Sequence, residues 1–142
     1  RQVGLNADNF MQALQASYAA AGVQAELTPF IDDTASAYAQ ADLVICRAGA
    51  STVTELAAVG AAAIYVPFPH AVDDHQTTNA RFVVDAGGGW VVQQTALSPE
   101  KLAHMIQNMQ RSTLLETAQK AKMMQKTEAT AAVVAACQEL AR

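Results

Sequence analysis

Hydrophobic and polar positions follow two different spacings along the chain, and the two alternate. Short, almost unbroken apolar runs occupy residues 42–49, 61–69 and 87–94, and such runs are typical of parallel strands that are buried on both faces. Around and between them lie segments whose apolar residues recur every three or four positions, which predicts helices. The predicted helices are 9–21, 32–41, 51–59, 76–86, 98–109, 112–122 and 127–140.

The alternation of strands and helices predicts an α/β fold: a Rossmann-like open parallel sheet with helices on both faces. A further short strand is expected within residues 23–32, ending at Pro29 because proline cannot donate to a strand ladder. In such sheets, ligands bind beyond the carboxyl ends of the strands. Attention therefore falls on Phe30, on Gly49 and on residues 67–75, all of which follow predicted strands.

Composition supports one compact domain and argues against several functions. The 142 residues are 51% hydrophobic and 15% charged, which favours a packed core over disorder. A net charge of -4 with only nine scattered Lys and Arg residues argues against nucleic-acid binding. No apolar run reaches the roughly 18 residues of a membrane span, and no signal segment is visible. The two cysteines lack a disulfide or metal spacing, which fits a reduced, cytoplasmic compartment.

The segment 46–60, CRAGASTVTELAAVG, joins a strand end to a helix start. A helix N-terminus offers unpaired N–H groups and a positive dipole end to a diphosphate. Gly49 is expected to allow a tight turn and a close approach of the anion, and Ser51 and Thr52 add hydroxyl groups. Glu55 has two interpretations that spacing does not decide. It completes a capping box with Thr52, or it accepts hydrogen bonds from two ribose hydroxyls.

The segment 67–81, PFPHAVDDHQTTNAR, allows three interpretations. The first is a loop followed by a helix that begins at an aspartate. The second is that His75, Gln76 and Asn79 line the start of that helix and bind sugar hydroxyls as neutral donors and acceptors. The third is a metal site, although no established ligand spacing supports it. Its candidate ligands are His70, Asp73, Asp74 and His75.

Three other residues have alternatives that the sequence leaves open. Phe30 and Ile31 are either core residues or a wall for a nucleotide base. Arg47 pairs either with a bound anion or with a nearby acid such as Asp42. The chain has no GxSxG nucleophile elbow, no Cys-His signature and no phosphate-binding G-x-x-x-x-G-K-[ST] loop, so hydrolase and kinase functions have no support.

Residues 28–92 resemble the MurG family, bacterial transferases that complete the disaccharide of lipid II with N-acetylglucosamine (GlcNAc) from UDP-GlcNAc. The resemblance rests on the order of TPFIDD, CRAGASTVTE, PFPHAVDDHQ and GGGWVV along the chain. The family has a two-domain GT-B fold, which implies that residues 1–142 are one donor-binding domain of a longer enzyme. The chain opens with RQVG where the family tends to have His-Gln-Ser/Thr-Gly, and the resemblance implies that the family's glycine-rich loop and first strand are missing from it.

The same resemblance assigns the substrate-binding residues. It implies that Phe30 and Ile31 meet the uracil, that the segment 50–55 embraces the nucleotide with Glu55 on the ribose, and that Gln76 with His75 faces the sugar. No catalytic residue, cofactor or metal is expected on this chain. The expected substrate-binding residues are Phe30, Ile31, Arg47, Gly49, Ala50, Ser51, Thr52, Val53, Thr54, Glu55, His75, Gln76 and Asn79.

The resemblance also implies a reaction. The C4 hydroxyl of the muramoyl sugar of lipid I attacks the anomeric carbon of GlcNAc with inversion, and UDP leaves. The acceptor and the membrane are expected to meet only the missing N-terminal domain, at the cytoplasmic face of the inner membrane, so this chain alone is expected to be inactive. Two alternatives remain: a GT-B enzyme for another UDP-sugar, or the donor-binding subunit of a split transferase. The apolar face of helix 127–140 is expected to be exposed or paired in a dimer.

Overall fold

The computed structural model describes residues 7–70 and 72–141. The chain divides into two compact units, Arg1–Thr34 and Ala35–Arg142, and each is described by itself. The first unit contains helix α1, Ala7–Ala20, which confirms the helix predicted at 9–21. Gly22 follows it with a φ of 67°, a left-handed conformation that suits glycine and turns the chain out of the helix.

The short strand predicted within residues 23–32 is not formed. After α1 the chain continues without regular structure as far as the next helix, and the Val23 N–H bonds back to the Tyr18 carbonyl at 3.0 Å. A strand exists only through its ladder with a neighbour, and the described part of the first unit offers no second strand. The alternating pattern of residues 23–32 therefore predicted a strand wrongly, because alternation alone does not supply a neighbouring strand to pair with.

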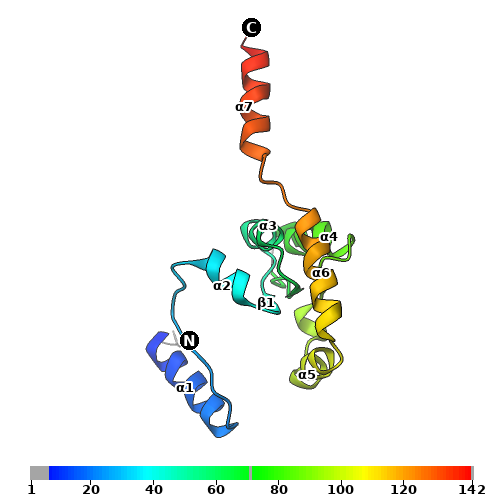
Figure 1. Ribbon diagram of the computed structural model, residues 1–142. Helices are drawn as coiled ribbons and strands as arrows, with labels where there is room; N and C mark the ends of the chain where they lie inside the picture. Colours follow the sequence, from blue (N-terminus) through cyan, green and yellow to red (C-terminus); the bar gives the residue numbers. More distant parts are fainter. Residues whose placement is uncertain (1–6, 71, 142) are drawn as a thin grey trace. The chain divides into compact units, whose positions relative to one another are not determined.

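The second unit contains a parallel sheet of three strands in the order β1-β2-β3. Figure 1 labels β1 and the helices of this unit. Ile64 in β2 lies opposite Ile45 in β1 and Trp90 in β3. Each predicted apolar run contains one of these strands, although each strand is shorter than its run. The prediction that all three are buried holds only for β2, because Ile45 in β1 is 45% exposed and β3 is only partly buried. The strands are β1 (Val44–Cys46), β2 (Ala63–Tyr65) and β3 (Trp90–Val91).

The structure confirms the six helices that were predicted from residue 32 onward, although their ends differ from the prediction by a few residues. The start of the helix predicted at 98–109 is confirmed by its capping contacts. The Ser98 hydroxyl accepts from the Lys101 N–H at 3.2 Å, and Pro99 occupies the first helical position. The helices are α2 (Thr34–Gln40), α3 (Ala50–Val59), α4 (His75–Val84), α5 (Pro99–Gln107), α6 (Arg111–Met123) and α7 (Ala129–Leu140), with 3-10 turns η1 (Val72–Asp74) and η2 (Gln94–Ala96).

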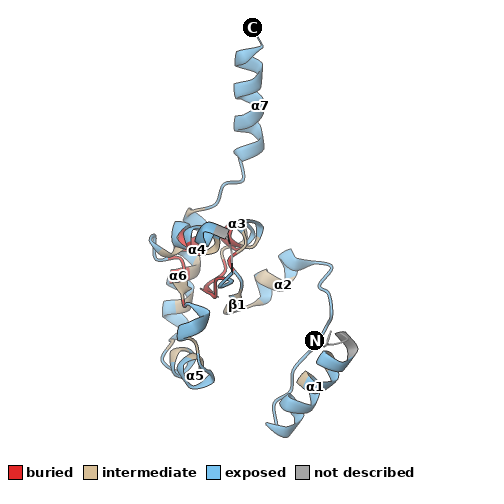
Figure 2. Cartoon of the chain, turned by 180° about the vertical axis from the view of Figure 1, so that it is seen from behind, coloured by how far each residue is buried: buried red, intermediate tan, exposed pale blue. Residues whose placement is uncertain are grey.

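The side chains of β2 alternate between two hydrophobic clusters, which places helices on both faces of the sheet. Ala63 and Tyr65 belong to a cluster with residues of α3, α4 and α6. Ile64 and Val66 belong to the opposite cluster, which α5 covers. Figure 2 shows the buried residues gathered in the strands and the adjoining helices. This arrangement confirms the predicted open α/β sheet.

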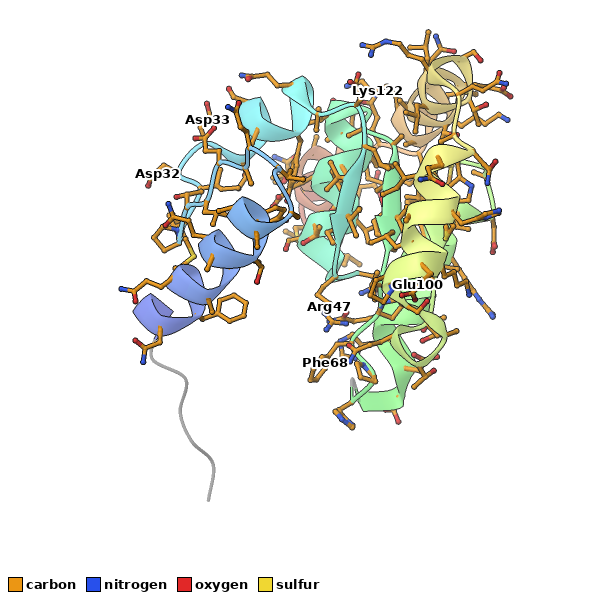
Figure 3. The ribbon with its side chains drawn as sticks, turned by 90° about the horizontal axis from the view of Figure 1, so that it is seen from below. Asp32, Asp33, Arg47, Phe68, Glu100 and Lys122 are labelled. Atoms are coloured by element: carbon orange, nitrogen blue, oxygen red, sulfur yellow. The ribbon has the colours of Figure 1, made fainter. Side chains whose placement is uncertain are left out.

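Helix α6 packs closely against the turn that leads from α4 into β3. A β-carbon added at Gly88 would lie 2.6 Å from Val83 Cγ1 and 2.8 Å from the Ala121 Cα. The Lys122 ammonium, labelled in Figure 3, donates to the Ala58 carbonyl near the end of α3. A cation at a helix C-terminus is favourable, because it meets the negative end of the dipole.

Helix α7 has no buried residue in the described chain. Val133 is 63% exposed, Val134 50% and Leu140 89%. The apolar face of this helix is therefore exposed in a single chain, as one of the two sequence alternatives expected. A dimer contact through it stays a prediction. Within the described residues, no helix has the length and apolar character that crossing a membrane requires.

The two cysteines are expected to react at very different rates. Cys46 lies beside Tyr65 in the sheet, and burial raises the pKa of its thiol to about 11, whereas Cys137 is exposed. Because the thiolate is the reactive form, one thiol per chain should react quickly with Ellman's reagent at pH 8, and both should react in denaturant. The variant Cys137→Ser should then show no fast thiol. Fast labelling of Cys46 in that variant would contradict the partial burial and the raised pKa of its thiol.

Candidate functional site

Three chain segments meet at the carboxyl edge of the sheet, one after each strand. Since the strands are parallel, residues after Cys46, Tyr65 and Val91 all reach the same edge. Arg47 ties these segments together. Its Nη1 donates to the carbonyls of Val66 and Pro67, each at 3.2 Å, and its Nη2 donates to Gln94 Oε1 at 2.7 Å. The two polar segments that the sequence singled out, 46–60 and 67–81, are therefore neighbours in space.

The Arg47 guanidinium also lies over the ring of Phe68, 5.6 Å from its centroid, and Figure 3 shows the two side chains together. The His70 ring meets the Phe68 ring edge-on at 5.6 Å. The alternative that Arg47 pairs with Asp42 is wrong, because Asp42 instead forms an ion pair with Arg111 at 2.9 Å. Contact between Arg47 and a bound anion stays a prediction.

The N-terminus of α3 opens at this edge. The helix begins at Ala50, and its first backbone bond runs from the Val53 N–H to the Gly49 carbonyl at 3.0 Å. No side chain from the N-cap position bonds to the first turn, so its N–H groups have no capping side chain. Gly49 has a φ of -63°, which any residue can adopt. The expectation that a tight turn requires glycine at this position is therefore wrong. What glycine provides here is space, since the nearest atom to an added β-carbon is Thr52 Oγ1 at 3.8 Å.

Glu55 does not cap the helix. It is the sixth residue of α3 and Thr52 is the third, so the pair cannot form the capping box that the spacing suggested. The Glu55 side chain is exposed. Burial and, after it, the negative charge of Glu55 raise the pKa of the Tyr38 hydroxyl, which places the carboxylate near α2. Of its two interpretations, only the ligand remains as a proposal.

The other residues of the segment 50–55 divide by their surroundings. Ala50 and Ser51 are exposed in the first turn of α3, and Thr52 is partly buried. The Val53 side chain is in the core, only 3% exposed, so it offers a ligand nothing but its backbone. The Thr54 hydroxyl is turned back onto the helix and donates to the Ala50 carbonyl at 2.6 Å. The groups of this segment that are accessible to a ligand are therefore mainly those of the first turn and the Glu55 side chain.

The approach to α4 has an unusual backbone. Asp73 and Asp74 have φ values of 52° and 51°, a left-handed conformation that is uncommon outside glycine. The Asp74 carboxylate does not cap the helix N–H groups but accepts from the Thr77 hydroxyl at 2.6 Å. Gln93 in turn donates to the same hydroxyl oxygen at 2.9 Å. Such strain persists only where neighbours hold it, and here side chains from two segments do so.

Two amide side chains of α4 contact the loop between β1 and α3. Gln76 Oε1 accepts from the N–H groups of Ala48 at 3.3 Å and Phe68 at 2.9 Å. Asn79 Nδ2 donates to the Ala48 carbonyl at 3.1 Å. The sequence analysis selected both residues as sugar ligands. It missed these contacts, because they join distant parts of the chain and no local sequence pattern indicates them. His75, also expected to meet the sugar, is exposed at the first position of α4.

Phe30 and Ile31 belong to the first unit and are 73% and 47% exposed. The Thr28 hydroxyl donates to the Phe30 carbonyl at 2.6 Å and fixes this turn locally. Neither side chain is part of a core within its own unit, so the core alternative has no support there. Their expected contact with a base stays a prediction.

The metal interpretation of residues 70–75 gains no support from the geometry. Across residues 7–70 and 72–141, His, Cys, Asp and Glu side chains form no group of three or more that could hold a metal ion.

Comparisons with known proteins agree with this arrangement. The glycosyltransferase family 28 C-terminal domain model matches residues 1–135. Two similar curated proteins are both named UDP-N-acetylglucosamine–N-acetylmuramyl-(pentapeptide) pyrophosphoryl-undecaprenol N-acetylglucosamine transferase. The protein from Polaromonas sp. (strain JS666 / ATCC BAA-500) is 73% identical over 91% of this chain and 33% of its own length. The protein from Paracidovorax citrulli (strain AAC00-1) is 70% identical over 92% of this chain and 37% of its own length.

A crystal structure of Acinetobacter baumannii MurG superimposes with a TM-score of 0.86 and 47% identity, covering 91% of this chain and 40% of that one. The chain therefore spans about a third of the length of these curated relatives, 33% and 37% in the two cases. The family match covers nearly the whole chain, and the chain belongs to the glycosyltransferase family 28 C-terminal domain family.

Proposed function

We propose that this chain is the donor-binding part of an inverting transferase that moves GlcNAc from UDP-GlcNAc to the C4 hydroxyl of lipid I. The observation that carries the proposal is the uncapped N-terminus of α3 at the carboxyl edge of the sheet, with no side chain at Gly49 to block it. A helix end of this kind favours a diphosphate. The names of the curated relatives supply the sugar and the acceptor.

In this proposal, residues 1–142 are one donor-binding domain of a longer two-domain enzyme at the cytoplasmic face of the inner membrane. The acceptor and the membrane contact the other domain, and this chain alone does not catalyse transfer. Neither a metal nor a cofactor takes part. The possible pairing of two copies through α7 is not required for donor binding.

The UDP-GlcNAc molecule is proposed to lie along α3 and across to α4. The diphosphate meets the first turn of α3, residues 49–52, and Glu55 lies about 5 to 9 Å further along the helix axis, at about 1.5 Å per residue. That span suits a nucleoside diphosphate whose ribose hydroxyls donate to the carboxylate. Contact of Phe30 and Ile31, in the first unit, with the uracil is proposed from the family resemblance alone. The sugar meets the start of α4, where His75, Gln76 and Asn79 lie.

The chemistry follows from this placement. A bond forms between the C4 hydroxyl oxygen of lipid I and the anomeric carbon, the bond from that carbon to the diphosphate oxygen breaks, and a base outside this chain takes the hydroxyl proton. Negative charge grows on the departing diphosphate. The N–H groups of the first turn of α3 are already oriented toward that charge, so they stabilise it more in the transition state than in the bound donor.

Calorimetric titration of the chain with UDP-GlcNAc, UDP-glucose, UDP and ADP tests the proposal. We expect UDP-GlcNAc to bind more tightly than UDP-glucose, ADP not to compete, and the affinities to be unchanged in EDTA. Equal affinity for both sugars would contradict the GlcNAc assignment. A loss of affinity in EDTA would contradict metal independence, and no binding of any uridine nucleotide would contradict the role of this chain as a donor site.

A further inference from the structure

We propose that Gln76 and Asn79 are positioning residues that hold the N-terminal turn of α3 in place through the backbone of Ala48. This inference rests on the proposed function, because it concerns the turn that binds the diphosphate. It gives the two amides a second role beside any contact with the sugar.

Ala48 needs partners from outside its own segment. It is fully buried, at 0% exposure, and it lies between the end of β1 at Cys46 and the start of α3 at Ala50. In that position it belongs to neither the strand ladder nor the helix, yet buried backbone groups are almost always hydrogen-bonded. Helix α4 supplies both partners: Gln76 accepts from the Ala48 N–H, and Asn79 donates to the Ala48 carbonyl.

The partners settle which amide atom is which. Gln76 contacts two N–H donors, so the contacting atom must be its oxygen, and Asn79 contacts a carbonyl, so the contacting atom must be its nitrogen. Both lone pairs of Gln76 Oε1 are used by Ala48 and Phe68. Gln76 therefore has only its NH2 group to offer a ligand, and a sugar hydroxyl at this point must accept.

The contacts join the two ends of the proposed donor site. Ala48 directly precedes Gly49, the N-cap of α3, while Phe68 lies in the segment that leads into α4. A shift of the start of α4 therefore moves Ala48, and with it the N–H groups that face the diphosphate. A change at the sugar end is expected to alter the affinity for UDP, which has no sugar to contact.

Two acid substitutions with equal charge test this. Gln76→Glu keeps an oxygen for the two N–H donors, whereas Asn79→Asp sets an oxygen against the Ala48 carbonyl. Both add one negative charge within one turn of α4, so repulsion of the diphosphate is similar in both. We expect Asn79→Asp to weaken UDP binding at least about tenfold more than Gln76→Glu, the effect of losing one buried hydrogen bond.

Amide hydrogen exchange provides a readout that needs no ligand. In Gln76→Leu, exchange of the Ala48 and Phe68 amides should be at least about tenfold faster than in the unaltered chain, and in Gln76→Glu it should stay close to the unaltered rate. Unchanged exchange in Gln76→Leu, or equal weakening of UDP binding by the two acids, would overturn the inference. If the unaltered chain fails to bind UDP, the proposed function fails, and the exchange rates alone decide this inference. They also decide it if Asn79→Asp does not fold.

Discussion

Replacing Glu55 with alanine should weaken UDP binding by more than about 1.5 kcal/mol, a loss of roughly tenfold or more in affinity, and leave the stability of the chain unchanged. The loss is expected because the carboxylate of the proposed site accepts two hydrogen bonds from the ribose, and hydrogen bonds to a charged group are the strong ones. Stability should not change, since Glu55 is exposed and does not cap α3. Calorimetry with UDP and denaturant unfolding measure the two effects separately.

The matched control is Glu116→Ala, which removes the same charge from an exposed position on α6. It should leave UDP affinity unchanged. An equal loss in both variants would mean that net charge, rather than a contact at Glu55, sets the affinity. A drop in stability of Glu55→Ala with unchanged affinity would show that the residue supports the fold and has no part in the ribose site.

Replacing Gly88 with alanine should lower the free energy of unfolding by about 2 to 3 kcal/mol, the upper part of the roughly 1 to 3 kcal/mol that overpacking a filled core usually costs. The new β-carbon would lie 2.6 Å from Val83 Cγ1 and 2.8 Å from both the Cα and the N of Ala121. Two of these three atoms are backbone atoms of α6, so they cannot move aside as the tip of a flexible side chain could. Denaturant unfolding measures the loss, with a midpoint shift at unchanged m-value.

Gly49→Ala is the control for the same chemical change. Its β-carbon would meet nothing closer than Thr52 Oγ1 at 3.8 Å, and its backbone conformation is open to alanine. It should cost less than about 1 kcal/mol, through the poorer N-cap propensity of alanine. Equal losses at Gly49 and Gly88 would mean that the stability effect comes from glycine itself and not from close packing against α6.

The secondary structure of the second unit could be predicted because its signals are local. The start of α5 is encoded by Ser98 and Pro99 within one turn, and the strands are encoded by short apolar runs, although only β2 is buried along its whole length. The strand expected within 23–32 failed for a complementary reason. Its alternation was also a local signal, but a strand depends on a neighbour that no local pattern specifies.

The location of the candidate site could also be predicted, because parallel strands bring every strand end to one edge. Its contacts could not. Arg47 bonds to Gln94, 47 positions away, while Asp42 pairs with Arg111, 69 positions away. Spacing had suggested Asp42 as a partner for Arg47 and Thr52 as a partner for Glu55, since sequence reasoning looks for partners within a few residues. Both suggestions were wrong once the helix start and the packing of α6 were known.

The sequence by itself determined the order of helices and strands, the parallel sheet and the edge at which a ligand is proposed to bind, because each of these depends on periodicity and on chain order. Only the tertiary structure decided which groups hold that edge together. The backbone of Ala48 meets Gln76 and Asn79, 28 and 31 positions further along the chain. Packing of the strand ends against α4 sets those contacts, and a buried peptide group accepts whichever suitable partner the packed neighbours place within reach.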